Sequence, residues 1–197
     1  MNQLQKSVLA LVVLTFCAAP LWAQGRGPTT TQTPTRVSPH ETISNRIGAG
    51  RGGVLVTITY GRPYSRDNRS GQIRKIWGTL VPWDKAWRMG SDEATTLITS
   101  QNMVIGDTTI PPGAYTLYMV PSQNGTSKLA FSKKIGFWGI PVDETQDLAR
   151  VDLKKASFEG VPVDQFTMAI DNLGAGGGVI RLLWENTQYS VPFTLKP

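Results

Sequence analysis

Residues 95–121 read TTLITSQNMVIGDTTIPPGAYTLYMVP, and this stretch decides the fold class of the chain. In its last third, apolar residues alternate with their neighbours, so that Tyr115, Leu117 and Met119 fall on one side of an extended chain. Gly106-Asp107 lies between two short apolar segments, which is typical of a two-residue hairpin turn. The stretch therefore predicts short antiparallel strands joined by tight turns.

The same period-two alternation recurs on both sides of this stretch. Before it, four large residues share one parity: Val54, Val56, Ile58 and Tyr60. After it, comparable segments occupy residues 129–131, 149–154, 166–170, 179–184 and 189–195. About nine short strands without a long amphipathic helix predict an all-β fold, in which one-sided strands bury their apolar faces against each other. We expect an antiparallel β-sandwich, with a closed β-barrel as the alternative.

Turn and loop signals separate these segments. Asn124-Gly125 and Asn186-Thr187 each lie between two strand-like segments, so both predict hairpin connections. Residues 133–146 carry no clear periodicity. We expect a long loop there, with room for one helical turn.

The first 23 residues have the pattern of a secretory signal peptide. Lys6 is their only charge, an apolar run follows over residues 8–16, and small residues lead to Ala23. The apolar run is shorter than the roughly 20 residues that a comfortable membrane span needs. We expect cleavage after Ala23, a periplasmic or secreted protein and no stable membrane span; an uncleaved N-terminal anchor is the alternative.

The remaining chain divides into a leader and one domain. Residues 24–37 are rich in Gly, Pro and Thr, a composition that cannot bury enough apolar surface to order itself. We therefore expect a flexible leader over residues 24–37 and a single folded domain over residues 38–197.

Charge and composition restrict the partners. The chain has 20 Lys and Arg against 14 Asp and Glu, and the excess is densest between Arg62 and Lys75, where Asp67 is the only acid. In an exported protein such a segment favours phosphates, anionic glycans or lipid head groups over nucleic acid. Cys17 is the only cysteine and His40 the only histidine. They cannot form a disulfide or a multi-histidine zinc site, so we expect no metal and no cofactor.

An aromatic and charged segment, residues 83–93, reads WDKAWRMGSDE. Its adjacent acids Asp92 and Glu93 can act on one ligand only if the backbone there forms a turn. Arg62 shares the parity of the inward-facing row that ends at Tyr60, and a desolvated guanidinium needs a carboxylate, for which we expect Glu93 first and Asp92 second. The candidate ligand-binding residues are Arg62, Trp83, Trp87, Arg88, Asp92 and Glu93.

This collection of arginines, acids and tryptophans suits a small polar or anionic ligand, or a glycan. Because no catalytic signature is present, we assign no catalytic residue and expect a non-catalytic binding module of the cell envelope. Two alternatives stay open. One is a hydrolase that uses Glu93 as acid or base, and the other is a structural envelope protein whose arginines and acids pair internally.

Five sequence motifs occur in order along the chain: SPH at 38–40, VTITYGRP at 56–63, RKIWG at 74–78, LVPWDKAWRMGSDEATT at 80–96 and PPGAYTLYMVP at 111–121. In these motifs the chain resembles the exported bacterial domain-of-unknown-function 2911 family over residues 38–195. The resemblance implies an all-β exported domain, and it implies no established activity, substrate or cofactor. The chain has Asp92 where the family typically has asparagine, and its loop at residues 64–72 is longer than usual.

Overall fold

The structure is a computed structural model that describes residues 38–48 and 52–197. The predicted signal peptide and leader, residues 1–37, lie outside the described residues. No helix of the described part is both long and apolar enough to span a bilayer.

The described part of the chain contains eleven strands, and every pairing between them is antiparallel. With one short 3₁₀ helix, η2, the elements in chain order are β1 (His40–Ile47), β2 (Val54–Gly61), β3 (Thr96–Thr99), β4 (Asn102–Ile105), β5 (Thr108–Ile110), β6 (Gly113–Val120), β7 (Ser127–Ser132), η2 (Glu144–Gln146), β8 (Asp147–Ser157), β9 (Val163–Gly174), β10 (Gly177–Glu185) and β11 (Thr187–Lys196).

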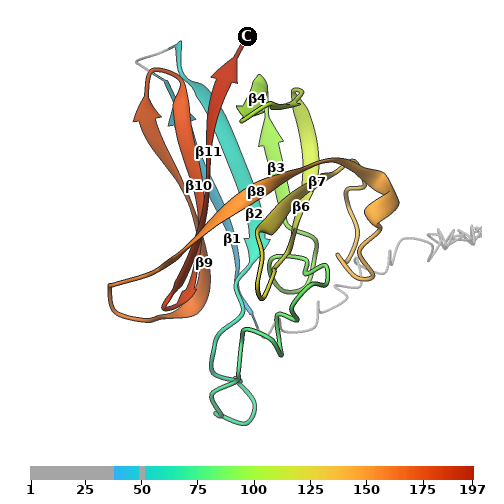
Figure 1. Cartoon of the computed structure of the whole chain (residues 1–197), viewed down its shortest axis with the longest axis vertical. Helices are drawn as coiled ribbons and strands as arrows, with labels where there is room; N and C mark the ends of the chain where they lie inside the picture. The colour runs from blue at the N-terminus through green and yellow to red at the C-terminus, as the bar shows by residue number, and fades with distance from the viewer. Residues whose placement is uncertain (1–37, 49–51) are drawn as a thin grey trace, which may run out of the picture. The chain divides into compact units, whose positions relative to one another are not determined.

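The strands follow one another in the order β1-β2-β3-β6-β7-β8-β11-β10-β9, with β4 added to β11 and β5 to β4. Strand β8 joins two groups of strands, because residues 147–153 pair with β7 and residues 154–157 pair with β11. Figure 1 shows these groups facing each other, with β8 crossing between them. Long strands that belong to two sheets are a common way to turn a corner in β-sandwiches.

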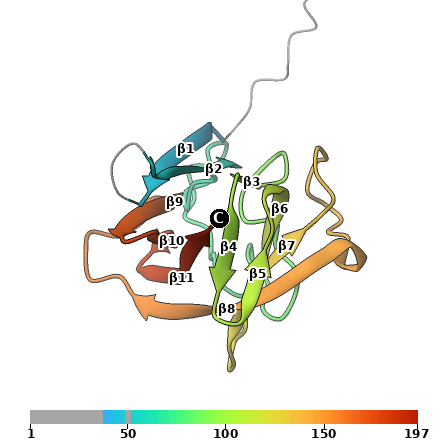
Figure 2. The same cartoon turned by 90° about the horizontal axis from the view of Figure 1, so that it is seen from above.

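The two ends of this strand order come together. Figure 2 shows β1 and β9 side by side, and Asn45 of β1 donates a hydrogen bond to the carbonyl of Ile170 in β9 at 2.7 Å. The prediction of an all-β antiparallel fold is confirmed, with eleven strands where about nine were expected. The sheet is almost closed, so a sandwich and a barrel both describe it.

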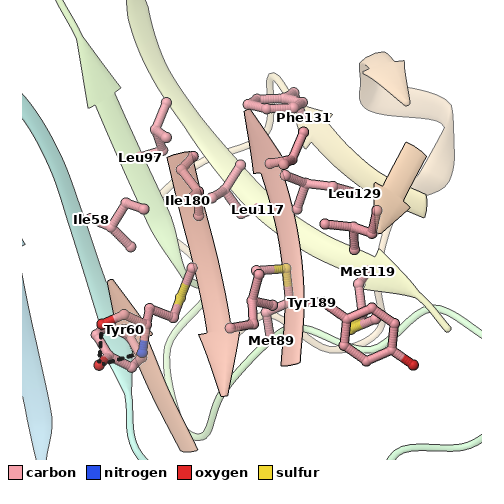
Figure 3. Close-up of a cluster of buried hydrophobic side chains, with 14 of the residues drawn as sticks. Ile58, Tyr60, Met89, Leu97, Leu117, Met119, Leu129, Phe131, Ile180 and Tyr189 are labelled. Carbon is pink, nitrogen blue, oxygen red and sulfur yellow. Dashed lines mark hydrogen bonds between the residues drawn. The ribbon is translucent and has the colours of Figure 1, made fainter. Parts of the chain in front are cut away.

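The core lies between the facing groups, as the alternation predicts. Val56, Ile58 and Tyr60 are buried, whereas Leu55, just before them, and Thr59 are exposed and Thr57 is half-buried. Figure 3 shows side chains from β2, β3, β6, β7, β10 and β11 meeting in one cluster. Each large apolar side chain buried in this way contributes about 1.5–3 kcal/mol to folding.

The three predicted hairpin turns have different outcomes. Asn124-Gly125 lies in the connection between the paired strands β6 and β7, as expected. Gly106-Asp107 connects β4 to β5 as expected. The β10–β11 turn is one residue earlier than predicted, because Trp184 pairs with Thr187 and leaves Glu185 at the turn with φ of 52°. The predicted helical turn within residues 133–146 is confirmed as η2.

Strand β6 departs from simple alternation, because all five residues from Tyr115 to Met119 are buried. On its second face, Tyr118 donates a hydrogen bond to Asp147 at 2.6 Å, and the Arg150 guanidinium lies 5.7 Å from the Tyr118 ring centroid. Residues from the start of β8 thus cover the face that alternation alone would leave to solvent.

Candidate functional site

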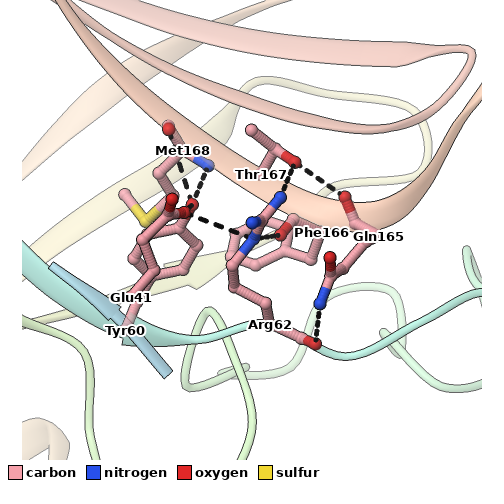
Figure 4. Close-up of polar contacts among 7 residues, drawn as sticks. All are labelled: Glu41, Tyr60, Arg62, Gln165, Phe166, Thr167 and Met168. Carbon is pink, nitrogen blue, oxygen red and sulfur yellow. Dashed lines mark hydrogen bonds and ion pairs between the residues drawn. The ribbon is translucent and has the colours of Figure 1, made fainter. Parts of the chain in front are cut away.

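Arg62 lies just after β2 and ties three strands together (Figure 4). Its Nη2 donates to Thr167 Oγ1 at 2.8 Å, and its Nε donates to the Phe166 carbonyl at 3.2 Å. Its carboxylate partner is Glu41 of β1, at 3.3 Å from Nε, in place of the expected Glu93. Because these contacts all lie within the β1–β2–β9 junction, we assign Arg62 a structural role.

Tyr60 supports the same junction. Burial raises the pKa of its phenol well above the ordinary value, so the hydroxyl stays protonated. It donates to Glu41 Oε2 at 2.7 Å and accepts a hydrogen bond from the Met168 amide at 2.9 Å, as Figure 4 shows. The inward-facing row of β2 therefore ends in a hydrogen-bonded network that joins β1 and β2 to β9.

The acid pair does sit on a turn, which was the condition for its two carboxylates to act together. Asp92 has φ of 63°, a conformation that Asp and Asn enter more readily than other residues with a side chain. Both carboxylates face one imidazole: His40 Nε2 lies 3.1 Å from Glu93 Oε2 and 3.6 Å from Asp92 Oδ2. His40, the first residue of β1, therefore attaches this strand to the loop at residues 90–93.

We expect His40→Ala to lower the free energy of unfolding by about 1–3 kcal/mol, because it leaves two neighbouring carboxylates without the shared imidazole. Urea denaturation measures this. Adding Asp92→Asn should recover part of the loss, since it removes one of the two repelling charges. Purely additive effects in the double variant would contradict the proposed coupling between His40 and the acid pair.

The tryptophans of the segment pack rather than face solvent. The side chain of Trp87 stacks on Trp184 with centroids 5.9 Å apart and meets the edge of Phe166 at 5.1 Å. The Trp87 backbone exchanges hydrogen bonds of 2.8 and 2.9 Å with Met119. Trp83 is half-buried and stacks on Trp77 at 6.1 Å. Trp87 is therefore a core residue that also borders the pocket described next.

A pocket of about 440 Å³ opens beside Trp87, and we call it the arginine pocket. Its apolar part includes Trp87 and Trp184, and its polar part contains three arginines and one acid. The lining residues are Ser38, Pro63, Asp67, Arg69, Arg74, Leu80, Ala86, Trp87, Arg88, Gly90, Ser91, Ile140 and Trp184. Of the six predicted site residues, Trp87 and Arg88 line this pocket; Arg62, Trp83, Asp92 and Glu93 do not.

Arg88 is held by backbone carbonyls. Its Nη1 donates to Asp92 at 2.8 Å and to Trp138 at 2.9 Å, and its Nε donates to Gly90 at 3.3 Å. Burial lowers the pKa of Arg88, and the nearby acids Asp92 and Glu93 oppose that shift. A guanidinium nevertheless stays charged at any physiological pH, so Arg88 is a fixed positive charge at the pocket wall.

The other two arginines have donors to offer. Arg74 donates from Nη2 to the Tyr64 carbonyl, while its buried Nε has no hydrogen-bond partner within the described residues. Arg69 is exposed, and its bond to Asp67 Oδ1, at 3.0 Å, comes from the backbone amide and not from the guanidinium. Both side chains can therefore present N–H groups to a ligand.

Asp67 offsets one of the three positive charges, and its own turn fixes its position. The same Oδ1 atom accepts hydrogen bonds from the Ser70 amide at 2.8 Å and the Ser70 hydroxyl at 3.0 Å. Those hydrogen bonds lower the pKa of Asp67, so it stays ionised. The density of arginines between Arg62 and Lys75 was the sequence signal for this pocket, but Arg69 and Arg74 were not named as site residues.

No group of three or more His, Cys, Asp or Glu side chains within residues 38–48 and 52–197 is arranged to hold a metal ion. Comparison with curated proteins and with solved structures found no match. A family model described as "Protein of unknown function (DUF2911)" matches residues 38–193, which is most of the chain. The chain therefore belongs to the DUF2911 family of proteins of unknown function.

Proposed function

We propose that this protein is a non-catalytic binding protein for a small anionic ligand, which it takes in the arginine pocket. The observation that carries the proposal is the placement of Arg69, Arg74 and Arg88 around one concave site, where Asp67 is the only acid among the described residues. Guanidinium groups bind carboxylates and phosphates through two parallel N–H bonds, which gives both affinity and orientation.

The three arginines differ in how far they are preorganised. Arg88 is fixed by three carbonyls and requires no ordering when a ligand arrives. Arg74 is half-buried, with one unpartnered donor among the described residues, and Arg69 is exposed and must be ordered by the ligand. We expect Arg74 and Arg69 to contact the ligand directly. Arg88 contributes a positive electrostatic potential that attracts the anion.

The apolar floor supports a small anion more than an extended glycan. Sugar stacking needs an open aromatic face, but the exposed fractions of Trp184 and Trp87 are 1% and 9%. Neither Asp92 nor Glu93 lines the pocket, which removes the carboxylates that a glycosidase-type hydrolase would bring to a ligand there. A ligand with a phosphate or carboxylate and a compact body fits best.

A thermal-shift comparison of three compounds tests the ligand class. Glucose 6-phosphate carries an anion and a compact body, inorganic phosphate carries the anion alone, and glucose carries the body alone. We expect the melting temperature to rise most with glucose 6-phosphate, less with phosphate and not at all with glucose. A response to glucose equal to that of its phosphate would contradict an anion site.

We also propose that the protein is exported and works in the periplasm or outside the cell. The support is the sequence pattern of residues 1–23. Fractionation of the cells that make the protein, followed by N-terminal sequencing, tests this. We expect an extracytoplasmic chain that begins at Gln24, and a cytoplasmic chain that keeps residues 1–23 would contradict it.

A further inference from the structure

A second pocket, also of about 440 Å³, uses neighbouring residues of the same loop as the arginine pocket but has a different chemistry. Two acids, Asp164 and Glu185, line it beside apolar side chains, so we call it the acidic pocket. It is lined by Ser65, Arg66, Ile73, Pro162, Val163, Asp164, Glu185, Asn186 and Thr187. None of these residues is in the predicted site.

The two acids are placed together by strand pairing. Glu185, the last residue of β10, pairs with Val163 of β9, so Asp164 is next to it. The backbone carbonyl of Asp164 accepts hydrogen bonds from the Ser65 amide at 2.6 Å and from Trp184 Nε1 at 3.3 Å, which fixes its position. Neither carboxylate belongs to an ion pair within the described residues.

These two carboxylates repel each other. Partial burial and the charge of Asp164 raise the pKa of Glu185. Glu185 also has φ of 52°, a conformation that Gly or Asn would adopt with less strain. Glu185 is thus a half-buried acid close to a second acid.

A separate observation points to the same pocket. Ser65 is 5% exposed, and its Oγ has no hydrogen-bond partner within the described residues. A buried hydroxyl without a partner costs about 1–3 kcal/mol, so it is rarely left in that state unless something else satisfies it. Its backbone is already used, since Ser65 N donates to Asp164 and Ser65 O accepts from Arg74.

We propose that the acidic pocket binds the ammonium group of a small organic amine. Asp164 and Glu185 accept hydrogen bonds from the ammonium, while Ile73, Pro162 and Val163 contact the apolar part of the ligand. Arg66 also borders the pocket, but its Nη1 is engaged by the Gly71 carbonyl. The pocket therefore has one more negative than positive side chain, which selects a cation over an anion of the same shape.

Three probes of matched shape test this at pH 8: pentylamine as the cation, 1-pentanol as the neutral form and pentanoate as the anion. Binding is followed by NMR, through the shifts of the backbone amides of Ser65, Glu185 and Asn186. We expect saturable shifts with pentylamine and none with pentanoate. Equal affinity for pentylamine and 1-pentanol would reduce the site to an apolar surface and overturn the proposal.

Variants separate the acids from general charge. Glu185→Gln and Asp164→Asn should each weaken pentylamine binding about tenfold, because each removes a charge-assisted hydrogen bond. Glu159→Gln makes the same change at an exposed residue outside the pocket and should leave affinity unchanged. Phosphate binding in the arginine pocket should survive Glu185→Gln. Pentylamine affinity that is equal in wild type and Glu185→Gln would overturn the assignment.

The stability of Glu185→Gln gives an independent readout. Folding raises the pKa of Glu185, so the ionised carboxylate disfavours the folded state. The free energy of unfolding of wild type therefore falls as the pH rises through this raised pKa. Glu185→Gln should therefore melt at a higher temperature than wild type at pH 7 and at nearly the same temperature at pH 4. A variant that is less stable at pH 7 would show that Glu185 serves the turn.

Discussion

Gly61→Ala is expected to be among the most damaging single substitutions in this protein. A Cβ at Gly61 would lie 2.1 Å from the carbonyl oxygen of Ser91 and 2.9 Å from its carbonyl carbon. These are backbone atoms, so relief requires moving the loop at residues 90–93. That loop carries both acids that contact His40, and Gly90 and Ser91 also line the arginine pocket.

We expect Gly61→Ala to reduce the free energy of unfolding by about 3–5 kcal/mol, at the upper end of single-residue effects. Urea denaturation followed by circular dichroism measures the change. Gly52→Ala is the matched control, because a Cβ there meets no atom within 4 Å. Similar stability of the two variants would show that the β2 end and the loop do not pack as closely as described.

Trp87→Ala should have the second-largest effect. Trp87 is 9% exposed, packs against Trp184 and Phe166, and exchanges two backbone hydrogen bonds with Met119. Removing a buried tryptophan side chain leaves a cavity and costs about 3–5 kcal/mol. Because Trp87 also borders the arginine pocket, anion binding should be lost together with stability.

Trp83→Ala serves as the control for Trp87→Ala in the same denaturation experiment. Trp83 is half-buried and stacks on Trp77, and its ring centroid lies 5.1 Å from Lys155 Nζ, but it does not line the arginine pocket. We expect a smaller loss of stability and unchanged phosphate affinity. If Trp83→Ala abolished phosphate binding while Trp87→Ala retained it, the pocket would be wrongly placed.

The regular strands were predictable because their signal is local. Alternation over residues 54–60 is read directly from neighbouring residues, and Val56, Ile58 and Tyr60 of the inward-facing row are buried in β2. Strand β1 was not predicted, because its positions include polar residues whose partners are distant in sequence. Glu41 pairs with Arg62, and Asn45 bonds to Ile170, so these polar side chains are satisfied only in the folded chain.

The clustering of arginines could be predicted from the sequence, but the residues that line the pocket could not. The arginine density of residues 62–75 indicated an anionic partner, and the segment at 83–93 contributed Trp87 and Arg88 to the pocket. Which arginine faces the pocket depends on competition for partners. Arg62 pairs with Glu41 on β1, a strand that was not predicted, and Arg88 donates to backbone carbonyls. Neither contact can be predicted from a local sequence pattern.

The measurement that tests the central claim most directly is calorimetric titration of glucose 6-phosphate into wild type, Arg69→Gln and Lys154→Gln. Arg69 lines the arginine pocket, whereas Lys154 is an exposed residue of β8 outside it, and both substitutions remove one positive charge. We predict saturable binding to wild type and Lys154→Gln, and affinity about tenfold weaker for Arg69→Gln. Equal affinity in all three proteins, or no binding to any, would contradict an anion-binding function for this pocket.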